Sequence, residues 1–129
     1  MPELKRILLV EDEPDIQIVA RLALENVGGF GVEVCSSGME AVEKAAGLDV
    51  DLILLDVLMP EMDGPTTLRE LRKVPELTKI PVIFLTAKVQ AHEVEQYRRL
   101  GALDVIPKPF DPMSLSQSVK EIWARSSRR

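Results

Sequence analysis

The sequence predicts a single α/β domain built on a doubly wound, five-stranded parallel sheet with helices on both faces. Two observations predict it: three uninterrupted apolar runs have the length of buried strands, and strand-like and helix-like segments alternate five times along the 129 residues. Such alternation implies right-handed crossovers, and we expect the strand order 2-1-3-4-5. We expect one core over residues 5–125, with residues 126–129 as a frayed tail.

The expected strands differ in how completely they are buried. Three runs of large apolar residues are typical of central strands that helices cover on both faces: residues 7–10, 52–55 and 82–85. The other two are an alternating Val-Glu-Val stretch and a very short Val-Ile pair, at residues 32–34 and 105–106. These two stretches suit positions nearer the edges of the sheet.

Helical periodicity fills the intervals between the strands. An apolar stripe predicts the first helix, which Gly28 and Gly29 end. The stripe comprises Ile16, Val19, Ala20, Ala23 and Val27. The second helix begins after Ser37, which has Glu40 three residues later in the spacing of a capping box. The third follows Asp63, a good N-cap residue.

The last two helices are also marked at their ends. The fourth is expected over residues 90–100 and ends at Gly101. The fifth opens with Asp111 and Pro112, an N-cap residue followed by a first-turn proline. Its buried stripe is Leu115, Val119, Ile122 and Trp123. We therefore expect Trp123 to belong to the core rather than to a binding surface.

Composition argues against several classes of function. Twenty-one acidic against sixteen basic residues give a formal charge of −5, which disfavours a nucleic-acid-binding surface. The single cysteine, Cys35, cannot form an internal disulfide and is expected to be a small buried hydrophobe. No apolar run approaches the ~18 residues of a membrane span, and the amino terminus has no signal-peptide core. We therefore expect a cytoplasmic protein that binds neither a membrane nor nucleic acid directly.

Chemically useful side chains follow four of the five predicted strands. They are Glu11 and Asp12 after the first strand, Asp56 after the third, Thr86 after the fourth and Lys108 after the fifth. In an open α/β sheet, ligands bind outside the carboxyl ends of the strands, where the strand order reverses. Because strands one and three are neighbours in the expected order, Glu11, Asp12 and Asp56 should share one cleft.

Three carboxylates in one cleft need a counter-charge. Two like charges ~4 Å apart repel by roughly 4 kcal/mol at an effective dielectric constant of about 20. Either a cation or protons must therefore bind. Mg²⁺ fits best, because it prefers oxygen ligands and is typically held by one or two carboxylates together with a phosphate.

Each of these residues also has a purely structural interpretation. Asp12, ahead of Pro14, would serve as an ordinary residue at a helix N-terminus. Thr86 suits a strand because it is β-branched, and Lys108 would be solvated at the surface. Asp56 is harder to explain, because an aspartate directly after four aliphatic residues is poor strand material without an obvious capping role. The joint arrangement, rather than any single residue, favours a functional site.

Four segments resemble the receiver domain of two-component response regulators. They are ILLVEDE (7–13), LLDVLMPEMDG (54–64), PVIFLTA (81–87) and KPF (108–110), all in the order and spacing of that family. The similarity extends from Lys5 to about Arg125. It implies a CheY-like, flavodoxin-like fold.

The resemblance implies a phosphoacceptor site. Asp56 would accept a phosphoryl group from a phosphohistidine on a histidine kinase or a histidine phosphotransfer protein. Asp12, Asp56 and the backbone carbonyl of Leu58 would hold Mg²⁺, with Glu11 acting mainly through a bound water. The chain would catalyse only its own phosphorylation and dephosphorylation, and would not be an enzyme acting on other substrates.

The resemblance also implies a switch. Thr86 and Lys108 would each bind a phosphoryl oxygen. Phosphorylation adds roughly −1.5 to −2 charge, and drawing Thr86 inward would shift the populations of a partner-binding surface over residues 90–125. That surface also allows a homodimer. The switch region comprises Thr86, Ala87, Val105 and Pro109, with a cis peptide bond before Pro109.

Two positions depart from the family pattern. Val105 stands where a switch aromatic usually lies, so we expect the relay to run through backbone and loop shifts. Leu58 lies two residues after Asp56 and offers no polar group to orient an attacking water. We therefore expect slow self-dephosphorylation.

Three other functions are alternatives. A pseudo-receiver would keep the fold and bind partners without phosphorylation, but the site is complete: Asp12, Asp56, Thr86 and Lys108. A phosphatase of the haloacid dehalogenase type would need a second aspartate where Leu58 stands. A flavin-binding module would need phosphate-cradling loops and more aromatic residues than one Trp, one Tyr and three Phe.

The only histidine, His92, is expected to be a solvated helix residue, so the donor histidine must belong to another protein.

Overall fold

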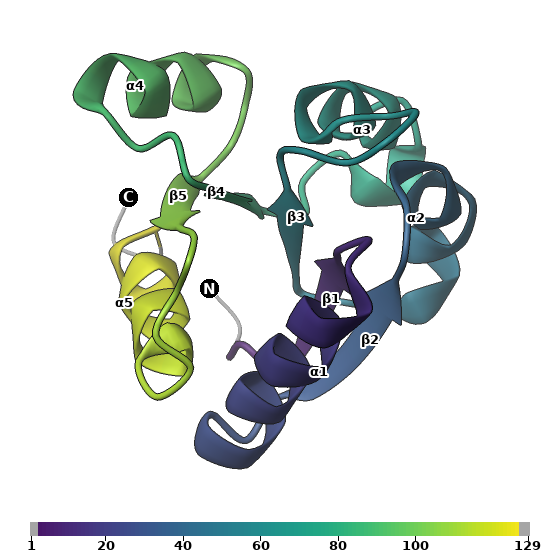
Figure 1. Cartoon of the computed structure of the whole chain (residues 1–129). Helices are drawn as coiled ribbons and strands as arrows, with labels where there is room; N and C mark the ends of the chain where they lie inside the picture. Colours follow the sequence, from purple (N-terminus) through teal and green to yellow (C-terminus); the bar gives the residue numbers. More distant parts are fainter. Residues whose placement is uncertain (1–2, 127–129) are drawn as a thin grey trace.

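The computed structural model describes residues 3–126, which form an α/β domain around a parallel sheet. The sheet has five strands in the order β2-β1-β3-β4-β5, as the sequence predicts (Figure 1). The strands are β1 (Arg6–Val10), β2 (Gly31–Cys35), β3 (Leu52–Asp56), β4 (Val82–Thr86) and β5 (Asp104–Pro107). The strand order reverses between β1 and β3, which pair in register from Ile7 with Leu52 to Val10 with Leu55.

The helices cover both faces of the sheet. They are α1 (Pro14–Leu22) with a π-helical turn η1 (Ala23–Val27), α2 (Gly38–Lys44) with η2 (Ala45–Leu48), α3 (Gly64–Leu71) followed by η3 (Pro75–Leu77), α4 (Ala91–Arg99) and α5 (Leu115–Ser126). Figure 1 shows α1 and α5 on one face and α2, α3 and α4 on the other. No helix within residues 3–126 has the length and apolar character needed to cross a membrane.

The three apolar runs are the centre of the core. Every residue of 7–10, 52–55 and 82–85 has no exposed surface, as expected for strands covered on both faces. Successive side chains point to opposite faces, so Ile7 and Leu9 pack under α1 and α5 while Leu8 and Val10 pack under α2 and α3. Because both faces of these strands are buried, the strands hold the polar residues at their carboxyl ends in place.

Side-chain caps define several helix starts. Ser37 Oγ accepts a hydrogen bond from the Glu40 N–H at 3.0 Å, as its spacing predicts. The Glu40 carboxylate in turn accepts a hydrogen bond from the N–H of Ser36 at 2.6 Å, one residue earlier than in a standard capping box. Asp63 Oδ1 caps α3 by accepting from Thr66 N–H at 2.9 Å.

The last helix begins later than predicted. Asp111 does not cap α5 directly: its carboxylate accepts from Met113 N–H at 3.0 Å, and its carbonyl accepts from Leu115 N–H at 3.0 Å. Residues 112–114 therefore form a turn, and α5 starts at Leu115. Trp123 is half-buried against the core beneath α1 and α5, so the prediction that it packs in the core is confirmed in part.

The apolar stripe predicted for the first helix is only partly buried. Ala20 and Ala23 are buried, but Val19 and Val27 expose 42% and 47% of their surface. The helix changes to a π-helical turn at Ala23, which alters the angular spacing and moves Val27 out of the stripe, whereas Val19 precedes that turn and lies on the exposed side of α1 itself. One side of α1 consequently presents apolar residues to solvent.

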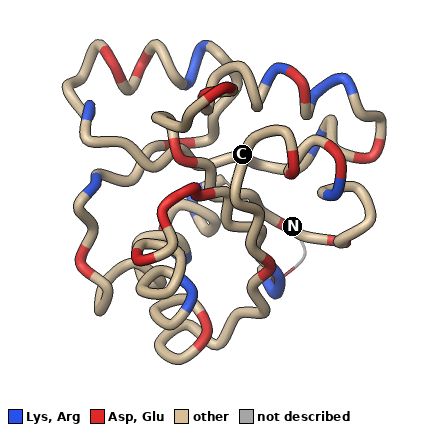
Figure 2. Tube along the Cα trace, turned by 45° about the vertical axis from the view of Figure 1, so that its right-hand side comes forward, with Lys and Arg blue, Asp and Glu red and all other residues tan. Residues whose placement is uncertain are grey.

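Charged residues are spread over the chain. Figure 2 shows Lys and Arg interspersed with Asp and Glu along most of the trace, in line with the modest net charge of −5. Several oppositely charged pairs lie on helix surfaces, including Lys44 with Glu40 and Arg99 with Glu95, both at 3.0 Å. Exposed pairs of this kind contribute little to stability.

Candidate functional site

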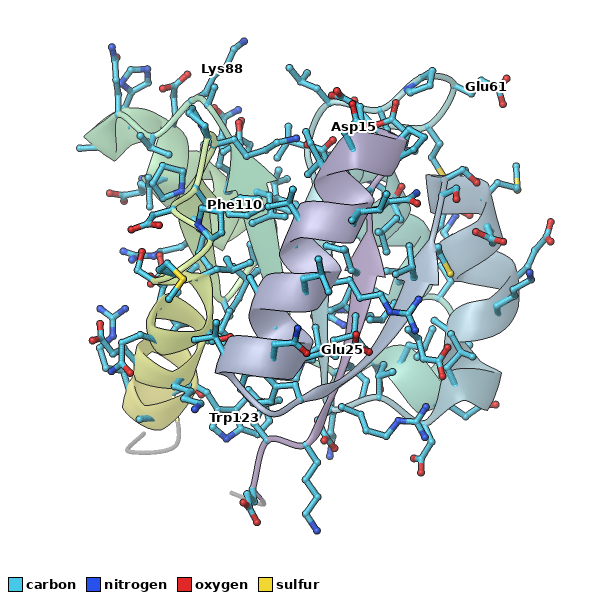
Figure 3. All side chains as sticks on the ribbon, turned by 60° about the horizontal axis from the view of Figure 1, so that its bottom comes forward. Asp15, Glu25, Glu61, Lys88, Phe110 and Trp123 are labelled. Carbon is cyan, nitrogen blue, oxygen red and sulfur yellow. The ribbon has the colours of Figure 1, made fainter. Side chains whose placement is uncertain are left out.

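The polar residues that follow the strands meet at the carboxyl edge of the sheet. Figure 3 shows this edge: Asp15, Glu61 and Lys88, from segments that follow β1, β3 and β4, lie along it, whereas Glu25 and Trp123 lie at the opposite edge. The convergence follows from parallel strands, because all their carboxyl ends point the same way.

Three carboxylates gather at the centre of this edge. Glu11, Asp12 and Asp56 each place an oxygen within 4.8 Å of the others. Glu11 and Asp56 are buried and Asp12 is half-buried. Within residues 3–126, Asp12 Oδ1 and Asp56 Oδ2 are buried without a hydrogen-bond partner. Buried anionic oxygens are costly without a partner, and hard oxygen donors in this number suit a Mg²⁺ ion, so the residues present fit that metal.

Lys108 brings the positive charge to the cluster. Its Nζ lies 3.0 Å from Glu11 Oε1 and 3.3 Å from Asp56 Oδ1. Burial alone would lower the pKa of Lys108, but the bond to Glu11 and the attraction of Asp56 outweigh it, and the pKa is raised. Burial raises the pKa of Glu11, against the opposing effect of its bonds to Glu13 N–H and Lys108. The Lys108 ammonium thus contacts two of the three carboxyl groups, those of Glu11 and Asp56.

Asp56 is held by the backbone around it. Val57 N–H continues the sheet by donating to Leu85 O at 3.0 Å, and Gly64 N–H donates to Val57 O at 2.8 Å. Leu58 N–H points at Asp56 Oδ1, 3.4 Å away, while the Leu58 side chain is two-thirds exposed, at 67%. The backbone of residues 56–58 therefore borders the acidic cluster.

Thr86 is the last residue of β4, one position after Leu85, which pairs with Asp56 in β3, and it is buried. Its hydroxyl oxygen accepts a hydrogen bond from Lys88 N–H at 3.1 Å, which leaves the hydroxyl hydrogen to donate elsewhere. Its carbonyl accepts from Lys108 N–H at 2.9 Å and so joins the ends of β4 and β5. Ala87, the next residue, is exposed.

The end of β5 has the geometry that the sequence resemblance implies. The Lys108–Pro109 peptide bond is cis. Val105 is half-buried opposite Phe84 of β4, and no ring stands at its position. An aromatic contact occurs nearby instead, because Tyr97 of α4 packs edge-to-face on Phe84, with centroids 5.2 Å apart and planes at 85°.

Two further residues at the site are not among the predicted site residues. Gln17 of α1 donates from its side-chain amide to the backbone carbonyl of Glu11 at 2.6 Å. Gly64 packs so closely that a Cβ atom there would lie 2.7 Å from Asp56 O. Only the fold brings these residues to the acidic cluster, although Gly64 belongs to one of the segments quoted above.

The side chains of His92 and Cys35 are not part of the acidic cluster. His92 is exposed on α4, as expected for a solvated helix residue. Cys35 is buried, and burial raises the pKa of its thiol to about 11. Both results agree with the structural interpretations given to these residues from the sequence.

Comparison with known proteins identifies the family. Residues 7–120 match the family model described as response regulator receiver domain. The chain is 37% identical over 124 residues to the transcriptional regulatory protein CpxR homolog of Haemophilus influenzae, covering 96% of this chain and 52% of that protein. This chain spans about half the length of the curated relatives it matches.

Solved structures agree with this assignment. The chemotaxis response regulator CheY4 of Vibrio cholerae superposes with a TM-score of 0.84 at 27% identity, covering 93% of this chain and 99% of that one. The receiver domain of the sensor histidine kinase PA1611 from Pseudomonas aeruginosa, solved with a magnesium ion coordinated in its active-site cleft, gives 0.80 at 31% identity, with 95% and 99% covered. On its sequence match and its fold, the chain belongs to the receiver domain family of two-component response regulators.

Proposed function

We propose that Asp56 is the phosphoacceptor of this receiver domain and that the phosphoryl group comes from a phosphohistidine on a histidine kinase or histidine phosphotransfer protein. A carboxylate oxygen of Asp56 forms the new bond to phosphorus while the bond from phosphorus to the imidazole nitrogen breaks. The observation that carries the proposal is the state of Asp56: it is buried, Lys108 lies near one oxygen, and the other oxygen has no partner within residues 3–126.

Mg²⁺ is the cofactor that the cleft suits. Asp12, Asp56 and the Leu58 carbonyl would hold it, with Glu11 acting through a water, and the ion would neutralise charge on the phosphoryl oxygens. Support comes from the three carboxylates within 4.8 Å and their unpartnered oxygens. The Pseudomonas receiver domain, with Mg²⁺ in its active-site cleft, gives independent support.

Thr86 and Lys108 receive the charge that the phosphoryl group brings. Lys108 already lies 3.3 Å from Asp56 Oδ1, so its ammonium can pair with a phosphoryl oxygen after a small movement. The Thr86 hydroxyl has a hydrogen to donate to another oxygen. Positioned donors of this kind stabilise developing charge without reorganisation.

The output is a shift of the surface over residues 90–125. A phosphoryl group that draws Thr86 inward moves the end of β4, and Phe84 on the same strand contacts Tyr97 of α4. Helix α4 has no fully buried residue, so little packing resists its displacement. With Val105 in place of a ring, we expect this contact and the adjoining loop to carry the shift. A homodimer through the same surface is a further proposal.

The phosphodonor docks on the exposed apolar side of α1. Ile18, Val19 and Leu22 are more than two-fifths exposed there. Two apolar cavities of about 220 and 280 Å³ adjoin along the helix and share Val19, and Lys108 and Phe110 line the first of them. Figure 3 shows Phe110 beside α1. A phosphodonor protein that brings its histidine to Asp56 must cover the cavity lined by Lys108 and Phe110. The exposed side of α1 is therefore continuous with the phosphoacceptor site.

Intact-mass analysis with Mg²⁺ and a small phosphodonor tests the proposal. We expect the parent protein to gain one phosphoryl group, Asp56→Asn to gain none, and chelation of Mg²⁺ to suppress the gain in the parent. Asp49→Asn is the control, because Asp49 is exposed and its left-handed backbone, with φ of 53°, suits asparagine. No labelling of the parent would favour the alternative of a pseudo-receiver that binds partners without this chemistry, and equal labelling of the parent and Asp56→Asn would assign the phosphoryl group to another residue.

A further inference from the structure

Gln17 makes two hydrogen bonds beside the acidic cluster. Its Nε2 donates to the backbone carbonyl of Glu11 at 2.6 Å and to Ser36 Oγ at 3.1 Å. An amide nitrogen carries two hydrogens, so both are used. The side chain thereby ties the segment after β1 to the segment after β2.

The bond to Glu11 fixes more than one residue. The Glu11 carbonyl belongs to the same planar peptide unit as the Asp12 N–H. When Gln17 sets the direction of that carbonyl, it also sets the backbone from which the Asp12 side chain projects. Glu11 N–H is held at the other end, by Cys35 O at 3.0 Å.

Asp12 depends on its backbone for orientation. Its buried Oδ1 has no hydrogen-bond partner within residues 3–126, so no donor aims that oxygen at the cleft. Glu11 differs, because Glu13 N–H and Lys108 Nζ hold its two carboxylate oxygens, at 3.1 and 3.0 Å. Repulsion from Glu11 and Asp56 would turn the Asp12 carboxylate away from the cleft unless the backbone of Asp12 is held in place.

The amide of Gln17 is itself anchored. Ser36, which accepts its second hydrogen, donates its own N–H to Glu40 Oε1 at 2.6 Å. Glu40 belongs to the first turn of α2. A short chain of hydrogen bonds thus runs from α2 to the acidic segment, and Gln17 is the link between them.

We propose that Gln17 is a positioning residue: it holds the Glu11–Asp12 peptide so that the Asp12 carboxylate faces Asp56, ready for the metal. This inference rests on the proposed function, because it concerns the metal site assigned there. Loss of a residue that orients metal ligands typically costs about 10- to 100-fold in metal affinity.

Calorimetric titration of the full chain with Mg²⁺ tests the inference. Gln17→Met keeps the length of the side chain and removes both donors, and we expect it to raise the Mg²⁺ dissociation constant about tenfold. Ser36→Ala removes only the anchor and should raise it less. Gln117→Met is the matched control, because Gln117 donates to Glu121 at 3.2 Å on α5, away from the cleft.

A second measurement separates positioning from general stability. At saturating Mg²⁺, phosphorylation of Gln17→Met by a small phosphodonor should return to the parental rate, and its thermal midpoint in chelator should match that of Gln117→Met. A dissociation constant equal to that of the control, or a rate that stays low at saturating Mg²⁺, would overturn the inference. If Gln17→Met does not fold, Ser36→Ala is used instead, and an unchanged Mg²⁺ affinity in Ser36→Ala would also overturn the inference.

Failure of the underlying proposal looks different. Asp12→Asn in an otherwise parental chain should weaken Mg²⁺ binding more than Gln17→Met does. If the parent does not bind Mg²⁺, or if Asp12→Asn binds it as tightly as the parent, the metal site is wrongly assigned. If Asp12→Asn weakens binding and Gln17→Met does not, only the role of Gln17 fails.

Discussion

At the scale of single residues, Gly64 shows how tightly the backbone of Asp56 is enclosed. The first residue of α3 lies directly behind the end of β3, where a Cβ atom would meet Asp56 O at 2.7 Å and Val57 Cα at 2.8 Å. Both neighbours are backbone atoms, which cannot move aside as a flexible side chain can. The lack of a side chain at Gly64 therefore sets the position of the proposed phosphoacceptor.

Gly64→Ala should displace Asp56 and slow its phosphorylation. Forced overpacking typically costs about 1–3 kcal/mol. Because small misplacement of a reacting group is costly, we also expect a roughly tenfold lower rate with a small phosphodonor. Denaturant unfolding and intact-mass time courses measure the two effects. Gly47→Ala is the control, since nothing lies within 4 Å of a Cβ there; equal behaviour of the two variants would refute the argument.

At the scale of elements, α1 combines two roles. Its inner side packs Ala20 into the core, and its first turn carries Gln17 to the acidic segment. Its outer side exposes Ile18 and Leu22, at 59% and 50%. The π-helical turn at its end leaves Val27 exposed as well. An apolar surface of this kind beside a reactive cleft is typical of a protein-binding face.

Leu22→Arg should separate docking from chemistry. We expect phosphorylation by a histidine kinase that acts on the parent to fall about tenfold or more, because a charge enters an apolar interface. Phosphorylation by a small phosphodonor should not change. Met39→Arg on α2 is the matched control, with 54% exposure against 50% for Leu22. If Leu22→Arg is phosphorylated more slowly by the small phosphodonor as well as by the kinase, docking on α1 is ruled out. A similar fall in kinase-dependent phosphorylation of Met39→Arg would also rule it out.

At the scale of the whole molecule, the acidic cluster lowers the free energy of unfolding. A folded domain is stable by only about 5–15 kcal/mol, and the acidic cluster lowers that margin because its carboxylates repel one another. Lys108 compensates for part of the repulsion through its contacts with Glu11 and Asp56. The protein therefore retains an unfavourable charge arrangement that a bound cation would relieve.

Asp12→Asn should stabilise the metal-free protein. Removing one half-buried charge from the cluster should raise the free energy of unfolding in chelator by about 1 kcal/mol. The same variant should lose most of the stabilisation that Mg²⁺ gives the parent, about 2.7 kcal/mol at a hundredfold excess over the dissociation constant. Urea unfolding with and without Mg²⁺ measures both, with Asp49→Asn as the control. A less stable metal-free Asp12→Asn would contradict this account.

The strand order and the arrangement of layers follow from patterns in the amino-acid sequence. Uninterrupted apolar runs at 7–10, 52–55 and 82–85 are typical of strands buried on both faces, and all are fully buried. Alternation with helices then leads to parallel strands whose carboxyl ends share one edge. Because Asp56 directly follows one of these runs, the place of the candidate site was readable as well.

The contacts between side chains at the site, in contrast, depend on how the whole chain packs. Lys108 and Glu11 are 97 positions apart, and the bond between Gln17 and Glu11 depends on the turn between β1 and α1. The exposed side of α1 and the late start of α5 at Leu115 also escaped the sequence patterns. The reason is physical: local periodicity and capping preferences act over a few residues, whereas contacts across the sheet edge depend on how whole elements pack.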